Sequence, residues 1–172
     1  MRNHFRTNSG KSGLGLGGVY MDSSSVFNES NWNDFNFIGS NEEFVSDSIL
    51  SNIYDIVTHT YSDAPGNLAL EEWGWFDFQN NYQFNVNNYK YVLRSANGQG
   101  AVKLWLKDYY NELGQSAHIT LRYSTDFTCE ADECGICGGD GSTCEQDECQ
   151  QIGDINNDGG YNVLDIVALA NC

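Results

Sequence analysis

Near the end of the chain, oxygen-bearing side chains recur at the spacing of a calcium-binding loop. Asp154, Asn156, Asp158, Asn162 and Asp165 fall at loop positions 1, 3, 5, 9 and 12. Gly159 stands where such loops turn sharply, and Gly160 offers its backbone carbonyl at position 7. The spacing therefore predicts a Ca²⁺ site followed by a short helix. The alternative is an Asx-rich turn that holds no ion.

The second chemically informative group is a set of six cysteines: Cys129, Cys134, Cys137, Cys144, Cys149 and Cys172. An even number of cysteines in a stretch rich in glycine and acids favours disulfides, and with them an oxidising compartment. The CxxC at 134–137 is also half of a zinc site or a redox motif, but neither a second metal-ligand pair nor a βα pattern accompanies it. The spacing does not choose among the pairings, although Cys172 is expected to close onto this cluster.

Charge is distributed unevenly along the 172 residues, and the formal net charge is −16. Residues 12–89 contain no Lys or Arg, five of the eight bases lie in 89–123, and 124–172 again contain none. This balance argues against nucleic acid and anionic membranes as partners. No apolar run is long enough for a transmembrane helix. Disulfides would imply secretion, but the N-terminus lacks a signal peptide. We therefore predict that the chain is a fragment.

Three stretches, 89–95, 101–110 and 118–124, alternate polar and apolar residues and are separated by turns rich in Gly and Asn. The period of two predicts adjacent antiparallel strands with one core face and one basic, solvated face. The expected core residues are Tyr91, Leu93, Val102, Leu104, Leu106, Ile119, Leu121 and Tyr123. The expected solvated residues are Lys90, Arg94, Lys103, Trp105, Lys107 and Arg122.

Further strands are expected before this meander. Residues 71–87 are rich in aromatic residues and contain an Asn-rich turn at Asn80–Asn81. The segment 42–57 is ambiguous, because part of its apolar spacing is helical and a short helix is an alternative there. Residues 9–20 predict a glycine-rich loop that leads into a strand. It is not a phosphate-binding loop, because no lysine follows its last glycines and no helix start is evident.

The chain divides into three segments: a β domain at 1–125, a cysteine-rich acidic linker at 126–150, and the calcium loop with its helix at 151–172. Residues 5–21 (FRTNSGKSGLGLGGVYM) and 91–124 resemble the HmuY family of secreted bacterial haem-binding β proteins. The resemblance covers about 1–124. It implies a mainly β fold with an antiparallel, sandwich-like domain, within which this chain begins after the first strands, so that sheet edges are left exposed.

The same resemblance implies haem as a ligand. Family members that bind haem hold the iron with two axial His or Met side chains. The axial candidates here are His59, in a loop-like stretch, and His118, at the start of the last strand; each has the alternative of being a solvated surface histidine. His4, Met1 and Met21 are the remaining side chains of suitable type.

Residues 134–144 resemble a short cysteine-rich unit of secreted modular proteins, and residues 153–171 resemble one half of a type I dockerin repeat. A dockerin has two loop–helix units and docks secreted enzymes onto a scaffold, so the resemblance implies a cohesin-like or cell-surface partner. The second unit is absent from this sequence. The pair usually used for partner contact is apolar, Val163 and Leu164.

Three functions follow as hypotheses. The first is a secreted or cell-surface binding protein that captures haem and carries a calcium-binding C-terminal unit. The second is a structural or adhesion module without haem affinity, and the third is a dockerin-tagged appendage of a polysaccharide-degrading system. Catalysis within the chain is not expected, because the adjacent Glu71 and Glu72 would point to opposite faces of a strand and form no acid–base pair.

Overall fold

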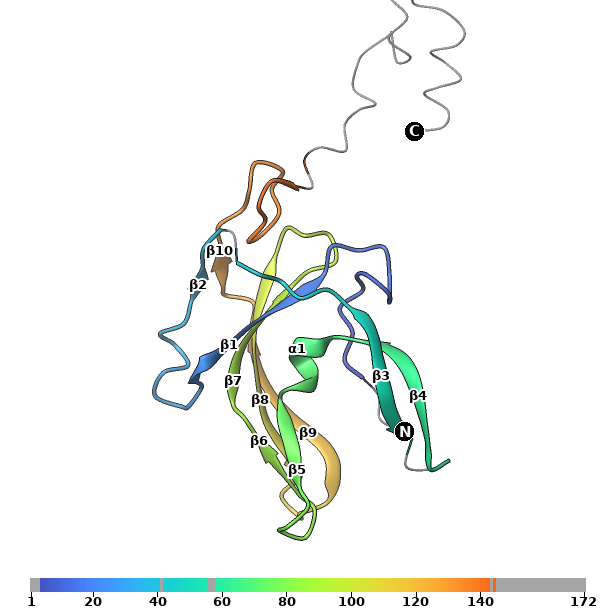
Figure 1. Ribbon diagram of the computed structural model, residues 1–172. Helices are drawn as coiled ribbons and strands as arrows, with labels where there is room; N and C mark the ends of the chain where they lie inside the picture. The colour runs from blue at the N-terminus through green and yellow to red at the C-terminus, as the bar shows by residue number, and fades with distance from the viewer. Residues whose placement is uncertain (1–3, 41, 56–57, 143, 145–172) are drawn as a thin grey trace, which may run out of the picture.

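A computed structural model describes residues 4–40, 42–55, 58–142 and 144, so the predicted calcium unit lies outside the described residues. The described chain is mainly β (Figure 1), which confirms the expected fold class. Its elements are β1 (Gly18–Val26), β2 (Phe37–Ile38), β3 (Ser48–Asp55), β4 (Thr60–Gly66), α1 (Leu68–Glu71), β5 (Gly74–Asp77), β6 (Gln83–Val86), β7 (Tyr89–Arg94), β8 (Ala101–Tyr110), β9 (Ser116–Ser124) and β10 (Thr128–Cys129). Within the described residues, no helix is long and apolar enough to cross a membrane.

The centre of the fold is a four-stranded antiparallel sheet in the order β1-β7-β8-β9. The predicted meander is thereby confirmed as β7, β8 and β9. The turn between β7 and β8 is closed by the Ser95 amide, which donates to the Gly100 carbonyl at 2.8 Å. Gly98 in this turn has φ +78°, a left-handed conformation that glycine adopts without strain.

Two hairpins extend from this centre (Figure 1): β3 pairs with β4, and β5 pairs with β6. The helical alternative for 42–57 is wrong, because β3 occupies Ser48–Asp55. Its pairing with β4 supplies the backbone hydrogen bonds that a helix would have made internally. The strands expected within 71–87 are confirmed as β5 and β6.

The central sheet has buried residues on both of its faces. On one face, α1 and the β5–β6 hairpin cover a core formed by Val19, Ala69, Leu70, Trp73, Phe84, Tyr91 and Leu106. On the other face, the segment between β1 and β3 and the chain after β9 cover two smaller groups. One contains Ile38, Val92, Ala101, Phe127 and Cys137, and the other contains Phe27, Trp32 and Trp105.

The expected solvated face of the meander is therefore wrong in its centre, where Lys103 is 2% and Trp105 5% exposed. The cause is the aromatic segment 27–38, which lies across β8 and removes that face from water. The prediction that side chains of β9 belong to the core is also wrong, because they are exposed. Ile119, Leu121 and Tyr123 are exposed, because β9 is an edge strand.

The first part of the cysteine-rich segment packs onto the sheet. Its disulfides are Cys129–Cys137 and Cys134–Cys144, which confirms disulfide bonding for four of the predicted cysteines. Cys149 and Cys172 lie outside the described residues. Cys137 is fully buried, and its amide donates to the Gly98 carbonyl at 2.8 Å, so this disulfide holds the loop against the β7–β8 turn.

Candidate functional site

The two predicted haem ligands lie on different elements of the fold. His59 is exposed in the turn between β3 and β4 and has φ +54°, a left-handed backbone that non-glycine residues adopt mainly in tight turns. His118 is exposed in β9, at the edge of the central sheet. The structure does not place them on a common element, and their pairing as one axial set stays a prediction.

Hydrogen bonding orients the ring of His118. Its Nδ1 lies 2.9 Å from the carbonyl oxygen of Ser116. A carbonyl can only accept, so Nδ1 donates in this contact, and the tautomer that makes this bond has its lone pair at Nε2. An exposed imidazole held in this tautomer is suited to ligating a metal through Nε2.

Two other residues of suitable type are engaged in the interior. The side chain of His4 is buried, with Nδ1 2.7 Å from Glu71 Oε1. Met21 is half-buried on β1 and packs against the α1-covered core. Neither residue can reach an external ligand without leaving its packing, and Met1 lies outside the described residues. Exposure therefore favours His59 and His118.

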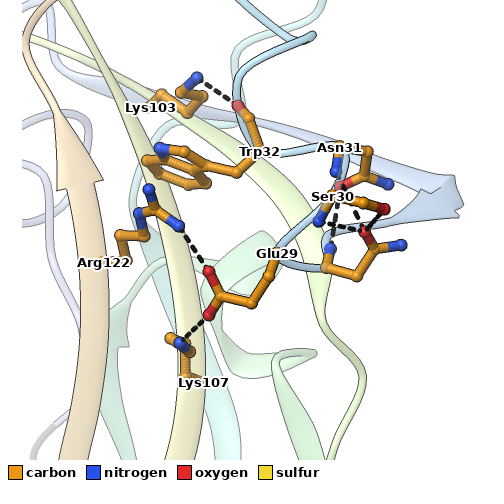
Figure 2. A network of polar contacts seen from close by, with 8 residues as sticks. Glu29, Ser30, Asn31, Trp32, Lys103, Lys107 and Arg122 are labelled. Atoms are coloured by element: carbon orange, nitrogen blue, oxygen red, sulfur yellow. Dashed lines mark hydrogen bonds and ion pairs between the residues drawn. The ribbon is translucent and has the colours of Figure 1, made fainter.

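A second notable feature is the Trp32 cluster, which we define as Trp32, Trp105, Lys103, Lys107, Arg122 and Glu29. Figure 2 shows the Trp32 ring between two cations. Lys103 Nζ is 4.3 Å from the ring centroid, and Arg122 Cζ is 4.7 Å from it. The Trp105 ring stacks on Trp32 at 6.2 Å and has Lys107 Nζ 4.6 Å from its own centroid. Cation–π contacts of this kind stabilise both the rings and the charges.

Glu29 joins two of these cations across the surface (Figure 2). Its carboxylate accepts from Lys107 Nζ at 2.5 Å and from Arg122 at 2.8 Å. The hydrogen bond from Lys107 is the main cause that holds the pKa of Glu29 below its usual value. The carboxylate is exposed, so this bridge adds little to stability. Its role is to attach the segment after β1 to both β8 and β9.

Lys103 is buried, and among the described residues no carboxylate forms an ion pair with its amine. Its Nζ donates to the Trp32 carbonyl at 2.6 Å and to Asn36 Oδ1 at 3.3 Å. Burial lowers its pKa, and the nearby Arg122 lowers it further. The amine thus ties the aromatic segment to β8 through the oxygens of that segment, and it is positioned for structure rather than for contact with an external ligand.

Asp47 is the centre of a third polar group, which lies between the glycine-rich loop and the start of α1. Its buried carboxylate accepts hydrogen bonds from the Thr7 amide at 2.7 Å, from Thr7 Oγ1 at 2.9 Å, from Asn67 Nδ2 at 2.9 Å and from Ser12 Oγ. Burial alone would raise the pKa of Asp47, but the bonds from Ser12, Asn67 and Thr7 outweigh it and hold the pKa below its usual value. Asp47 therefore joins the glycine-rich loop to the start of α1.

The glycine-rich loop of residues 8–17 leads into β1 as predicted. A side chain at Gly17 would overlap the backbone carbonyl of Thr7, and one at Gly13 would overlap the side chain of Asn8. The glycines allow the chain to pass close to its own preceding turn. Their function here is local packing around Asp47.

The cysteine loop contains the one group of metal-ligating type found among the described residues: Asp132, Cys134 and Cys144, whose ligand atoms lie within 4.8 Å of one another. Both sulfurs belong to the Cys134–Cys144 disulfide. Asp132 accepts from the amides of Cys134, Ile136 and Gly141, and these bonds, that of Ile136 first, hold its pKa below the usual value. The zinc and redox alternatives for the CxxC are contradicted, because its two cysteines belong to different disulfides.

A shallow groove separates this loop from the sheet, and Arg94 lies along it. The guanidinium donates to the Leu16 carbonyl at 2.8 Å and to the Cys137 carbonyl at 3.3 Å, and it lies 4.7 Å from the Phe44 ring centroid. Burial lowers the pKa of Arg94, although Asp132 and Asp140 act in the opposite direction. These contacts hold the cysteine loop in place.

Sequence reasoning missed the Asp47 group and the Trp32 cluster. For Trp32 a signal was present, because the stretch 27–38 contains Phe27, Trp32, Phe35 and Phe37 and needed a surface to cover. For Asp47 no spacing signal exists, because its partners Thr7, Ser12 and Asn67 come from distant segments.

Comparisons with known proteins agree with the mainly β fold. The family described as HmuY protein matches residues 1–123, whereas no curated protein matches the chain. The fold is similar to that of a Bacteroides vulgatus protein described as HmuY-like and heme binding, with TM-score 0.52 and 18% identity over 65% of this chain and 64% of that one.

Two further structures are similar. One is from Bacteroides fragilis and is described as a lipoprotein (TM-score 0.47, 18% identity, 65% of this chain and 63% of that one). The other is apo PinO from Porphyromonas gingivitis (TM-score 0.46, 16% identity, 63% and 56%). The chain thus spans less than two thirds of each of these structures. Because the family model covers most of the sequence, this chain belongs to the HmuY family.

Proposed function

We propose that this chain is a non-enzymatic binding protein that captures haem through exposed histidines of its β domain. Membership of the HmuY family supports a binding role, and the similar structure described as heme binding supports this choice of ligand. The observation that carries the proposal within this chain is the exposure of His59 and His118, with the Nε2 lone pair of His118 left open by the Ser116 contact.

Haem iron requires an axial atom with an accessible lone pair. The buried His4 is engaged with Glu71, so it is excluded as a ligand in the folded chain. His59 lies in the β3–β4 turn and His118 in the central sheet, and each is proposed as an axial ligand in its own right. Whether one haem meets both is decided by the spectrum, since two axial ligands and one give different Soret positions.

A haem titration of the purified chain, followed in the Soret region, tests the proposal. A saturable, red-shifted band is expected, and His59→Ala or His118→Ala is expected to weaken binding by about tenfold or more through loss of an iron ligand. His4→Gln is the matched control, and it should keep the band because His4 does not contact the ligand. Absence of a band in a sample folded by circular dichroism would contradict haem capture and favour the structural or adhesion module.

We also propose that the C-terminal residues bind calcium and act as a dockerin-like unit. The support is the ligand spacing at Asp154, Asn156, Asp158, Gly160, Asn162 and Asp165, all of which lie outside the described residues. An extracellular or cell-surface location, and a cohesin-like or cell-surface partner, belong to the same proposal. The paired cysteines agree with an oxidising compartment.

Calorimetric titration with Ca²⁺ tests the calcium site. Saturable binding by the full chain is expected, and Asp154→Ala combined with Asp158→Ala should weaken it by more than about tenfold, because two of the charged ligands are lost. Asp147→Ala, an acid outside the loop, is the control and should leave binding unchanged. Equal binding by the loop variant and the control would contradict the assignment and indicate non-specific association of Ca²⁺ with an acidic chain.

The boundary between the β domain and the cysteine-rich segment also becomes a proposal. Phe127, Ile136 and Cys137 are buried, and Phe127 and Cys137 share a core with Val92 of the sheet. We infer that residues 126–142 fold together with the β domain and are not part of a separate linker.

A further inference from the structure

The β7–β8 turn contains the one Asn–Gly pair of the sequence, Asn97–Gly98. At such a pair the backbone amide attacks the preceding side chain most readily, because glycine has no side chain to obstruct the approach. The Gly98 nitrogen bonds to Asn97 Cγ and the Cγ–Nδ2 bond breaks, so that the amide proton and the Nδ2 group leave together as ammonia. Water then opens the five-membered succinimide to aspartate or isoaspartate. The reaction, a deamidation, needs no reactant other than water.

The carbon that would be attacked is already polarised in the fold. Asn97 is exposed, and its Oδ1 accepts hydrogen bonds from Ser95 Oγ at 2.6 Å and from the Gln99 amide at 3.1 Å. Two donors on a carbonyl oxygen stabilise the negative charge that develops there when a nucleophile adds to its carbon. The side chain of Asn97 is therefore prepared for the reaction.

The attacking nitrogen, in contrast, is held by the turn. The Gly98 amide donates to the Ser95 carbonyl at 2.9 Å, and Gly98 is buried. An N–H that is hydrogen-bonded and removed from water does not readily give up its proton, which it must do before the nitrogen can attack. The Gly98 carbonyl is also held, because it accepts from the Cys137 amide at 2.8 Å. The reaction therefore requires a local opening of the turn.

The cysteine loop covers this turn (Figure 1). A side chain at Gly98 would meet the side chain of Ile136, whose Cδ1 lies 2.6 Å from the position that a Cβ would take. The cover is fastened by Cys137, which is fully buried and bonded to Cys129 on β10. Opening of the turn therefore requires the loop to lift, and the Cys129–Cys137 disulfide opposes that movement.

We propose that Asn97 is a deamidation site which the oxidised chain protects, and that the Cys129–Cys137 disulfide controls its reaction. A small thiol reduces this disulfide and is itself oxidised to a disulfide, after which the loop lifts and the Gly98 nitrogen is released. The product does not revert. Aspartate adds a negative charge to the turn, and isoaspartate adds a methylene group to its main chain, so the modified turn keeps a permanent record of the reduction. This inference is independent of haem and calcium.

Incubation of the purified full chain at mildly alkaline pH, followed by peptide mass spectrometry and an isoaspartate assay, tests the proposal. Asn97 of the folded parent chain is expected to react at least about tenfold more slowly than in denaturant, because the rate follows the population of the open turn. Cys129→Ser combined with Cys137→Ser removes the controlling disulfide and should raise the rate of the folded chain by about tenfold or more.

Two controls accompany this comparison. Cys134→Ser combined with Cys144→Ser removes the neighbouring disulfide and should leave the rate at Asn97 close to that of the parent chain. Asn111, in the turn between β8 and β9, is followed by Glu112 rather than glycine and should stay intact in every sample.

Ile136→Ala provides a second way to loosen the loop, should the Cys129→Ser and Cys137→Ser chain fail to fold by circular dichroism. It keeps both disulfides, removes the side chain beside Gly98, and should raise the rate by about threefold or more. A folded parent chain that reacts at Asn97 as fast as in denaturant overturns the proposal. So does a rate that every folded loop variant leaves unchanged, or an equal rise when the Cys134–Cys144 disulfide is removed instead.

Discussion

Replacing Asp47 with alanine is expected to lower the free energy of unfolding by about 3–5 kcal/mol, the cost of breaking a buried charged network. The Asp47 carboxylate accepts four hydrogen bonds from Thr7, Ser12 and Asn67. Removal leaves the Thr7 amide without its acceptor, whereas Thr7 Oγ1, Ser12 Oγ and Asn67 Nδ2 keep only their bonds to Ser9 and Val45. The glycine-rich loop then keeps only its bonds with the backbone of residue 47, which are donated by the Lys11 amide and accepted by Ser9 Oγ, so its attachment to the segment before β3 is weakened.

Denaturant unfolding of the parent chain and Asp47→Ala measures this effect. Asp63→Ala is the control, because Asp63 is an exposed aspartate on β4 and its loss should change stability by less than about 0.5 kcal/mol. If the two variants lose equal stability, Asp47 has no special role in the fold.

The depressed pKa of Asp47 gives the same network a pH dependence. A carboxyl whose folded pKa lies below its unfolded value contributes stability that is present above the unfolded value and is lost as pH falls through the folded one. For Asp47 the unfolded reference is 3.8, so the loss is expected at pH values below this reference. The stability difference between the parent chain and Asp47→Ala should therefore shrink in acid, when unfolding is measured as a function of pH.

Trp105→Ala is the second substitution with a large expected effect, about 3–5 kcal/mol of unfolding free energy. The indole is buried, stacks on Trp32 and packs at a tilt against Phe27, and its Nε1 donates to Asn88 Oδ1 at 2.8 Å. Alanine leaves a cavity between β8 and the aromatic segment and removes the ring beside which Lys107 lies. Asn88 also loses its donor.

The matched control is Trp75→Ala, since Trp75 projects from β5 and is largely exposed. Its loss should cost about 1 kcal/mol or less. Thermal unfolding followed by near-ultraviolet circular dichroism compares the two. Equal destabilisation by both substitutions would mean that the face of β8 carrying Trp105 is not part of a core. This face would then be solvated, as the alternation pattern of the sequence predicts.

The strands of the meander and their order could be predicted from the sequence, because local alternation and the Gly- and Asn-rich turns specify them. The burial of each face could not. Lys103 and Trp105 alternate with Leu104 and Leu106 as a polar face alternates with a core. Which face meets water depends on the segment 27–38, whose path over the sheet no local pattern encodes.

The candidate site likewise has one part that could be predicted from the sequence and one part that depends on the tertiary fold. Disulfide bonding of the four described cysteines could be predicted from composition, but their pairing follows from how the loop after β9 folds, in which Cys134 and Cys137 bond to different partners. The histidines could be named from a family resemblance, whereas the Nδ1 contact of His118 with Ser116 depends on the local course of β9. Asp47 and its donors meet only through the tertiary fold.

The short parallel pairing of β2 with β10 has a consequence for the order of folding. It brings Phe37 beside Thr128, and the Thr128 hydroxyl donates to Asn36 across a separation of 92 positions. Contacts between positions far apart in the sequence form late, because the entropy cost of closing the long loop must be met before these contacts can stabilise the chain. During synthesis the aromatic segment leaves the ribosome long before Phe127 and Cys137, which complete its side of the sheet. That side of the nascent chain stays open until the chain beyond β9 arrives, so this face of the molecule is closed last.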